Sequence, residues 1–326
     1  MKSFTLFNPK SLGDAVGALA APTSSVKVLA GGQDLLTEMK EHLVEPDKLV
    51  NLKGVPGLDR IEFTAAGACT IGALVTVGAL EEHAGVRERL RVLAEAAGSV
   101  GSPQIRSVGT VGGNLCQRPR CWYYRSEHAK CLKKGGDECF SFSGQNKYNA
   151  ILGGGPSYIV HPSDLAPALV ALGATVTLKC STGERQVALE RFFTLPGEGD
   201  IRRETVLRDD EVLTHVHVPA PAAGMQSTYV KFRERGSYDF ALASVALALW
   251  RDGARVKEAR VVLGGVAPIP WRAKAAEAAL AGAAFEAATF ARAADGAVQG
   301  AEGFGQNDYK IPLTKGLVQR ALQSCG

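Results

Sequence analysis

The sequence predicts an α+β protein of two domains, and three observations lead to this prediction. The 326 residues are 46% hydrophobic with a mean hydropathy near zero, which suffices for an ordinary globular core. Strand-like and helix-like patterns alternate along the chain. A stretch rich in proline and alanine at 219–224 has the composition of a linker. We therefore expect one domain at 1–222, divided into subdomains at about 1–55 and 56–222, and a second α+β domain at 225–326.

The first subdomain reads as a small α/β unit. Residues 11–21 have helical spacing of apolar side chains, with Ser11 placed to cap the helix. The apolar run 26–30 predicts a short buried strand that leads into Gly31 and Gly32, and a helix is expected at 34–40.

The second subdomain repeats the order of strand, turn and helix. A strand at 70–75 precedes a helix that Thr76 could cap, and a further helix is expected at 87–97. The glycine-rich segment 102–114 predicts a loop. Residues 116–155 show no sustained period, and so long an irregular stretch is improbable in a compact domain unless it wraps a cofactor. Beyond it, the sequence predicts a helix that starts at 161–164 and ends near 172, and strands at 174–180 and 211–219.

The C-terminal domain begins with strand patterns and ends with helical ones. Strands are expected at 228–233, 243–251 and 259–263, followed by alanine-rich helices at 273–282 and 286–294.

Charge and hydropathy exclude several partners. The 37 basic and 33 acidic residues give a formal charge of only +4, far from the density that binds nucleic acid. No run of about 18 apolar residues predicts a membrane span. The first residues lack the pattern of a secretion signal, so we expect a cytoplasmic protein.

Four of the seven cysteines, Cys116, Cys121, Cys131 and Cys139, fall within 24 residues. Such clustering in an intracellular chain indicates metal or redox chemistry rather than a disulfide scaffold. Iron–sulfur clusters accept thiolates from irregular loops, whereas structural zinc more often uses closely paired cysteines. Six basic and three acidic residues accompany the four cysteines, and this excess would offset thiolate charge. An iron–sulfur cluster, a zinc ion and free thiols all remain open from the spacing.

Two double-glycine turns indicate an anionic ligand. The first is Ala30-Gly31-Gly32-Gln33-Asp34-Leu35, after a predicted strand, and the second is Thr110-Val111-Gly112-Gly113-Asn114. Glycines let backbone N–H groups approach a diphosphate without interference from a Cβ atom. Each turn alone could be an ordinary tight turn, but the pair favours one shared ligand.

These motifs resemble a known family. The AGGQDL turn, the TVGGN loop, the HPSD helix start at 161–164 and the strand ending at Pro219 occur in the order typical of FAD-binding (medium) subunits of xanthine dehydrogenase-type molybdenum hydroxylases. The resemblance extends to YKIPL at 309–313. It implies an FAD-binding fold of the vanillyl-alcohol oxidase (PCMH) type in two subdomains, followed by a small C-terminal flavoprotein domain.

The resemblance also implies roles for individual residues. It places a set of residues from both turns around the FAD pyrophosphate: Val28, Leu29, Ala30, Gly31, Gly32, Gln33, Asp34, Leu35, Thr110, Gly112, Gly113 and Asn114. Asp164 would hydrogen-bond the flavin nucleotide, and Leu213 and Lys231 would lie near the flavin ring. Asp164 could instead be a helix cap, Lys231 a solvated strand residue and Leu213 a core residue.

One branch of the family, similar to periplasmic aldehyde oxidoreductase and 4-hydroxybenzoyl-CoA reductase, carries a [4Fe-4S] cluster in an inserted loop at this place. The resemblance therefore implies that Cys116, Cys121, Cys131 and Cys139 hold such a cluster. Members with this loop often have a cysteine where this chain has Ser157. Cys116, Ser157 or another group would then complete the ligand set.

By resemblance, the chain passes electrons between iron–sulfur centres and an external donor or acceptor through FAD. Its partners would be a molybdopterin-binding large subunit and a [2Fe-2S] small subunit, and no catalytic residue is expected in the chain itself. Two rival functions stand beside this one. The chain could be a self-contained flavin oxidase of the vanillyl-alcohol oxidase type, or a zinc-binding interaction module without flavin.

Overall fold

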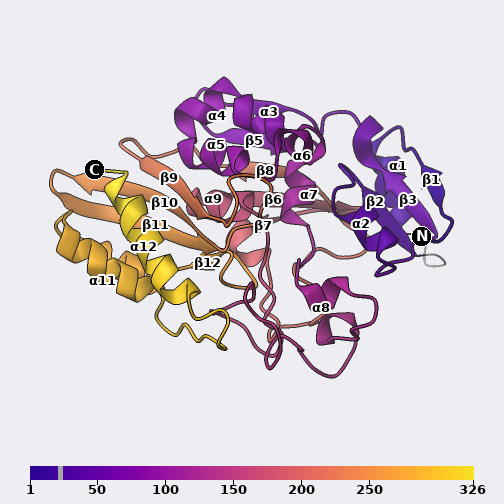
Figure 1. Ribbon diagram of the computed structural model, residues 1–326. Coiled ribbons are helices and arrows are strands. Elements are labelled where there is room, and N and C mark those ends of the chain that lie inside the picture. Colours follow the sequence, from indigo (N-terminus) through magenta and orange to yellow (C-terminus); the bar gives the residue numbers. More distant parts are fainter. Residues whose placement is uncertain (21–24) are drawn as a thin grey trace.

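The computed structural model describes residues 1–20 and 25–326. Three sheets organise these residues, and Figure 1 shows the smallest at one end of the molecule and the C-terminal sheet at the other. Helices cover both larger sheets, and the predicted α+β class is confirmed.

The N-terminal unit holds β1 (Thr5–Phe7), α1 (Leu12–Leu19), β2 (Val26–Leu29), α2 (Leu35–Lys40) and β3 (Lys48–Asn51). Its strands are parallel in the order β1-β3-β2. Ser11 caps α1 as predicted, because its side chain accepts from the N–H of Asp14 while the Asp14 carboxylate accepts from the N–H of Ser11. The predicted end of this helix at Ala21 lies outside the described residues.

The second unit is built on an antiparallel sheet of order β4-β5-β8-β6-β7. Its strands are β4 (Ile61–Phe63), β5 (Cys69–Gly72), β6 (Thr175–Cys180), β7 (Gly183–Ala188) and β8 (Val212–Val218). Its helices are α3 (Val77–Glu82), α4 (Ala84–Arg89), α5 (Arg91–Gly98), α6 (Pro103–Val108), α7 (Val111–Leu115) and α9 (Leu165–Ala171).

Two predictions about this unit were wrong. The single helix expected at 87–97 is two helices, because the chain breaks at Leu90, whose φ of −127° and ψ of 50° leave the helical region. The loop expected at 102–114 contains α6 and α7. Ser102 caps α6 by accepting from the N–H of Ile105, and Thr110 caps α7 by accepting from the N–H of Gly113. Local capping therefore outweighs the high glycine content.

The segment 116–155, which we call the cysteine loop, is mostly irregular, as predicted. It contains one short helix, α8 (Trp122–Arg125), and a 3-10 turn at Leu132–Lys134. Two other 3-10 turns, Leu52–Gly54 and Leu189–Arg191, lie elsewhere in the chain. Figure 1 shows the loop below the space between the N-terminal unit and the C-terminal domain. Its last residues are tied to that domain, since Asn146 donates to the carbonyl oxygen of Phe304 and Asn307 donates to that of Ala150.

The C-terminal domain is an antiparallel sheet of β9 (Gln226–Phe232), β10 (Ala243–Asp252), β11 (Arg255–Gly264) and β12 (Trp271–Arg272). Helices α10 (Lys274–Leu280), α11 (Ala287–Ala297) and α12 (Lys310–Gln323) cover one face. The other face joins the core around α5 and α9. Burial on both faces explains why eight consecutive residues of β10, Ala243 to Trp250, are buried and why the strand has no polar alternation.

A buried lysine fixes the start of α12. Lys310 is fully buried, and its Nζ atom donates to the carbonyl oxygens of Tyr148 and Gly265 at 2.9 and 2.8 Å. Burial lowers the pKa of Lys310 from 10.5 to about 7. A neutral amine has two N–H donors, which matches these two acceptors.

This lysine predicts a pH-dependent stability. Between pH 7 and 10.5 the unfolded chain holds a proton on Lys310 that the folded chain does not, so the free energy of unfolding should rise with pH across this window, by up to roughly 4 kcal/mol. Urea unfolding at pH 7 and pH 9.5 measures this rise. In a Lys310→Met variant the rise should be largely lost, and an unchanged pH dependence in that variant would refute the assignment.

Within the described residues, no helix combines the length and the apolar character needed to cross a membrane.

Candidate functional site

The two glycine turns meet in space, although about 80 residues separate them. A Cβ atom on Gly31 would lie 2.4 Å from the carbonyl oxygen of Val108 and 3.1 Å from the Cα atom of Gly109, just before the second turn. The backbones of the two turns are therefore in direct contact, and only glycine fits at position 31. The need for glycine at this position is therefore explained by the packing of the two backbones, as well as by the approach of a ligand.

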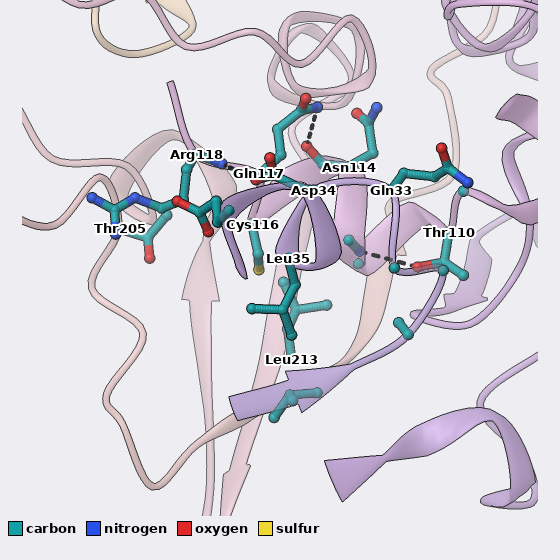
Figure 2. Close-up of a pocket in the computed structure, with 18 of the residues that line it drawn as sticks. Gln33, Asp34, Leu35, Thr110, Asn114, Cys116, Gln117, Arg118, Thr205 and Leu213 are labelled. Carbon is teal, nitrogen blue, oxygen red and sulfur yellow. Dashed lines mark hydrogen bonds between the residues drawn. The ribbon is translucent and has the colours of Figure 1, made fainter. Parts of the chain in front are cut away.

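One cavity of about 830 Å³ opens between the turns. Most of the residues that the resemblance implied line it: Val28, Ala30, Gly31, Gly32, Gln33, Asp34, Leu35, Thr110, Gly112, Gly113, Asn114, Asp164 and Leu213. Leu29 and Lys231 lie outside its wall. Figure 2 shows Leu35, Thr110 and Leu213 around this pocket. A cavity of this size has room for a ligand larger than most small substrates.

The first turn offers free donors to the cavity. Among the described residues, the backbone N–H groups of Gly32, Gln33, Asp34 and Leu35 have no hydrogen-bond acceptor. Gly32 has a φ of +74°, a left-handed conformation that turns successive N–H groups toward one side. Such a row of unpaired N–H groups is an anion-binding arrangement and fits a diphosphate.

The second turn contributes a wall rather than donors. The N–H of Gly112 donates to the carbonyl oxygen of Ala73, the N–H of Gly113 to the Thr110 hydroxyl and the N–H of Asn114 to the Thr110 carbonyl. The side-chain oxygen of Asn114 accepts from the Ser163 hydroxyl at 2.5 Å. Thr110 and Asn114 thus hold the turn in shape, while Gly113 is exposed toward the cavity.

Asp164 forms a buried polar centre in the wall of the cavity. It stands at the N-cap position of α9 but its side chain makes no capping hydrogen bond. Instead its two carboxylate oxygens accept from the hydroxyl of Tyr229 at 2.6 Å and from Nζ of Lys231 at 2.7 Å. The side chains of Asp164 and Lys231 are only 5% and 4% exposed. Lys231 is therefore a buried ion-pair partner and not a solvated strand residue.

The sequence interpretation missed Tyr229 at this centre. Burial and the neighbouring Asp164 carboxylate raise the pKa of Tyr229 well above its ordinary value, so Tyr229 stays protonated and donates to Asp164. The two-residue period of β9 was the available signal, because Tyr229 and Lys231 must point to the same face.

The structure separates Cys116 from the other three predicted cluster ligands. Cys116 ends α7 and lines the large cavity, where burial raises the pKa of its thiol to about 12. Its place follows from the packing of α7 against α9 and β8. Cys121, Cys131 and Cys139 lie together in the cysteine loop, close enough for the charges of Cys121 and Cys139 to act on the thiol of Cys131.

Each of these three thiols also has an N–H donor. The Asn149 side-chain amide donates to Sγ of Cys121 at 3.7 Å, and the N–H of Tyr158 donates to Sγ of Cys139 at 3.5 Å. The N–H of Lys133 interacts with the thiol of Cys131. Within residues 1–20 and 25–326, no three His, Cys, Asp or Glu side chains gather tightly enough to hold a single metal ion. The three thiols are thus grouped in one loop, each with an N–H donor nearby.

A family model described as the FAD binding domain in molybdopterin dehydrogenase matches residues 2–221. The chain belongs to this family. A second model, the CO dehydrogenase flavoprotein C-terminal domain, matches residues 227–325. The chain is thus an oxidoreductase subunit, an FAD-binding medium subunit of the molybdenum hydroxylase family.

Individual relatives agree with the family. The chain is 39% identical to the aldehyde oxidoreductase FAD-binding subunit PaoB of Escherichia coli over 86% of both chains. It is 30% identical to the carbon monoxide dehydrogenase medium chain of Hydrogenophaga pseudoflava, over 98% of this chain and 96% of the relative. Neither relative is named as a self-contained oxidase or a zinc module, and neither rival function is favoured.

Solved structures give the same fold. Carbon monoxide dehydrogenase from Hydrogenophaga pseudoflava superposes with a TM-score of 0.78 at 31% identity, over 99% of this chain and 96% of the other. Quinoline 2-oxidoreductase from Pseudomonas putida 86 superposes with a TM-score of 0.77 at 26% identity, over 100% and 98% of the two chains. The FAD-binding fold followed by a C-terminal flavoprotein domain, as the resemblance implied, is confirmed.

Proposed function

We propose that this chain is the electron-transferring subunit of a molybdenum hydroxylase complex. Its partners in this proposal are a molybdopterin-binding large subunit, a [2Fe-2S] small subunit and an external electron carrier. The observation that carries the proposal is the single cavity between the two glycine turns, with the free N–H groups of residues 32–35 on one wall. When bound there, FAD supplies the redox chemistry. The division into domains at 1–222 and 225–326 and the cytoplasmic location stay predictions.

The residues of the chain bind and orient the cofactor in this proposal. The N–H groups of the first turn receive the diphosphate, and Gly113 in the second turn leaves room for it. The buried pair of Asp164 and Lys231 presents fixed charges beside the cavity, and Leu213 supplies an apolar wall. Fixed charges in a water-poor site change the relative stability of the redox states of a bound group without any movement of the protein.

We further propose that the cysteine loop carries the predicted [4Fe-4S] cluster. Three thiols with N–H donors support this proposal. The predicted fourth ligand, Cys116, lines the large cavity between the glycine turns instead. A second cavity of about 350 Å³ is lined by Cys121 and by Asp164. This second cavity supports a short path for electrons between the cysteine loop and the FAD site.

A visible spectrum of the purified protein tests the function. Flavin bands with a broad iron–sulfur shoulder are expected, and released flavin should be identified as FAD by chromatography. Flavin bands without iron would remove the cluster from the proposal but keep the FAD function. A colourless protein that neither retains nor rebinds FAD would overturn the function itself.

Single cysteine substitutions should sort the ligands of the cluster. We expect Cys131→Ala to lose most of its iron, because a cluster needs all of its thiolates at one point. Cys116→Ala should keep its iron if the three thiols of the loop bind without it. Iron and acid-labile sulfide per chain are the measurement, with Cys180→Ala as the control. Full iron content in Cys131→Ala would remove Cys131 from the ligand set.

A further inference from the structure

Asp34 poses an electrostatic problem in the first glycine turn. Its carboxylate belongs to a turn that lines the cavity and has free N–H groups, and a bound diphosphate would be repelled by this second negative charge. Although Asp34 stands at the N-cap position of α2, its side chain makes no capping hydrogen bond with that helix. The structure shows where the carboxylate is used instead.

Three donors from the start of the cysteine loop surround the Asp34 carboxylate. The backbone N–H of Arg118 donates to Oδ2 at 2.6 Å, as Figure 2 shows. The guanidinium groups of Arg125 and Arg120 lie 2.7 and 3.0 Å from Oδ1. The side chain of Asp34 is 16% exposed and that of Arg125 12%, so water screens these contacts only partly.

The same segment follows α2 along its length. The Tyr124 hydroxyl donates at 2.5 Å to the carboxyl of Glu38, which is 4% exposed. The guanidinium groups of Arg118 and Arg125 lie 5.0 and 5.4 Å from the centre of the Tyr124 ring. Residues 118–125, which we call the arginine brace, therefore contact α2 from its N-cap, Asp34, to Glu38 in its second turn.

The cysteine loop also contacts a second segment of the cavity wall. Nε of Arg118 lies 2.6 Å from the carboxylate of Glu204, and Nζ of Lys133 lies 2.6 Å from the same group. The side chains of Lys133 and Glu204 are 2% and 5% exposed. Glu204 belongs to a cavity-lining segment that includes Arg202 and Arg203. One loop thus contacts both the glycine turn and this segment of the cavity wall.

We propose that the arginine brace is a positioning element for FAD. By neutralising Asp34 and holding its side chain away from the α2 backbone, the brace keeps the N–H groups of the glycine turn free for the diphosphate. Because segment 118–125 contains Cys121, the structured state of the cysteine loop and the affinity for FAD are coupled. The structured loop favours FAD binding, and bound FAD favours the structured loop by the same free energy. The inference rests on the FAD site described above and assigns a role to Tyr124 and Arg125, which do not line its cavity.

The test compares FAD and ADP binding in an Arg125→Met variant. The dissociation constants for FAD and for ADP should both rise at least tenfold, by the same factor, because ADP shares the diphosphate and lacks the flavin. The matched control is Arg272→Met, which breaks an equally short and similarly buried pair with Glu277 in the C-terminal domain. Its dissociation constants should not change. Thermal unfolding reports whether each variant is folded.

A double-mutant cycle separates a direct effect from loss of structure. If Arg125 acts through Asp34, the combination Asp34→Asn with Arg125→Met should weaken ADP binding no more than Arg125→Met alone. If Arg125→Met does not fold, Tyr124→Phe takes its place in the test. This variant removes only one oxygen atom and should also weaken ADP binding. Wild-type affinity in the folded Arg125 variant, or weaker FAD binding with unchanged ADP binding, overturns the brace. A wild-type chain that binds neither ligand overturns the FAD site itself.

Discussion

A Gly113→Val variant should fold normally and contain no FAD. Gly113 is exposed toward the cavity, and a Cβ atom there would meet only the Thr110 hydroxyl at 3.0 Å within the protein. The rest of the valine side chain would project into the space of the ligand. Since the N–H groups of the first turn lie across the same cavity, the added bulk separates the diphosphate from its donors. Absorbance at 450 nm per chain, after purification with added FAD, measures the loss.

Two further glycine substitutions make this result specific. Gly316→Val also places a β-branched residue in a helix, but a Cβ at Gly316 meets nothing within 4 Å, so FAD content should be unchanged. Gly112→Val should instead lower the melting temperature, because its Cβ would lie 2.8 Å from that of Ala73. A Gly113→Val protein with normal FAD content would show that the second turn is not part of the binding wall.

Loss of the lysine from the buried ion pair should destabilise the chain strongly. The Asp164 side chain is only 5% exposed. In Lys231→Met its carboxylate keeps the hydroxyl donor of Tyr229 but has no cation beside it. Removing one partner of a buried pair typically costs about 3–5 kcal/mol, because the remaining charge stays desolvated. Urea unfolding of the FAD-free protein measures this cost.

The double variant Asp164→Asn with Lys231→Met checks the cause. It removes both charges and should recover a large part of the lost stability, whereas independent effects would add. Lys315→Met, which removes an exposed pair with Asp295, is the control and should cost less than about 1 kcal/mol. A similarly small cost for Lys231→Met would contradict the role of the pair in the core.

Local signals in the sequence were reliable where they act within a few residues. The capping of α1 by Ser11 and of α3 by Thr76 was predictable, because each cap hydroxyl accepts from an N–H group three residues later. The alternation that predicted β8 is likewise a property of neighbouring residues. The break at Leu90 had no such signal, because the periodicity on both sides continues through it.

The candidate site was only partly predictable for a related reason. The two glycine turns carry their own signal, but the sequence does not say that the N–H groups of the second turn are already bonded to Ala73 and Thr110. It also does not say that the Asp34 carboxylate binds the arginine brace. The bond to Ala73 and the ion pairs of Asp34 join residues that are 39 to 91 positions apart along the chain.

The sequence by itself determined the class of the fold, the two turns and the resemblance that led to FAD, because glycine, capping and periodicity act locally. The tertiary structure alone decided that the turns touch, that Lys231 pairs with Asp164 and that Cys116 lies apart from the other three thiols. The physical reason is that burial and charge pairing depend on which distant segments pack together. Packing fixes these partners through contacts that no local pattern records.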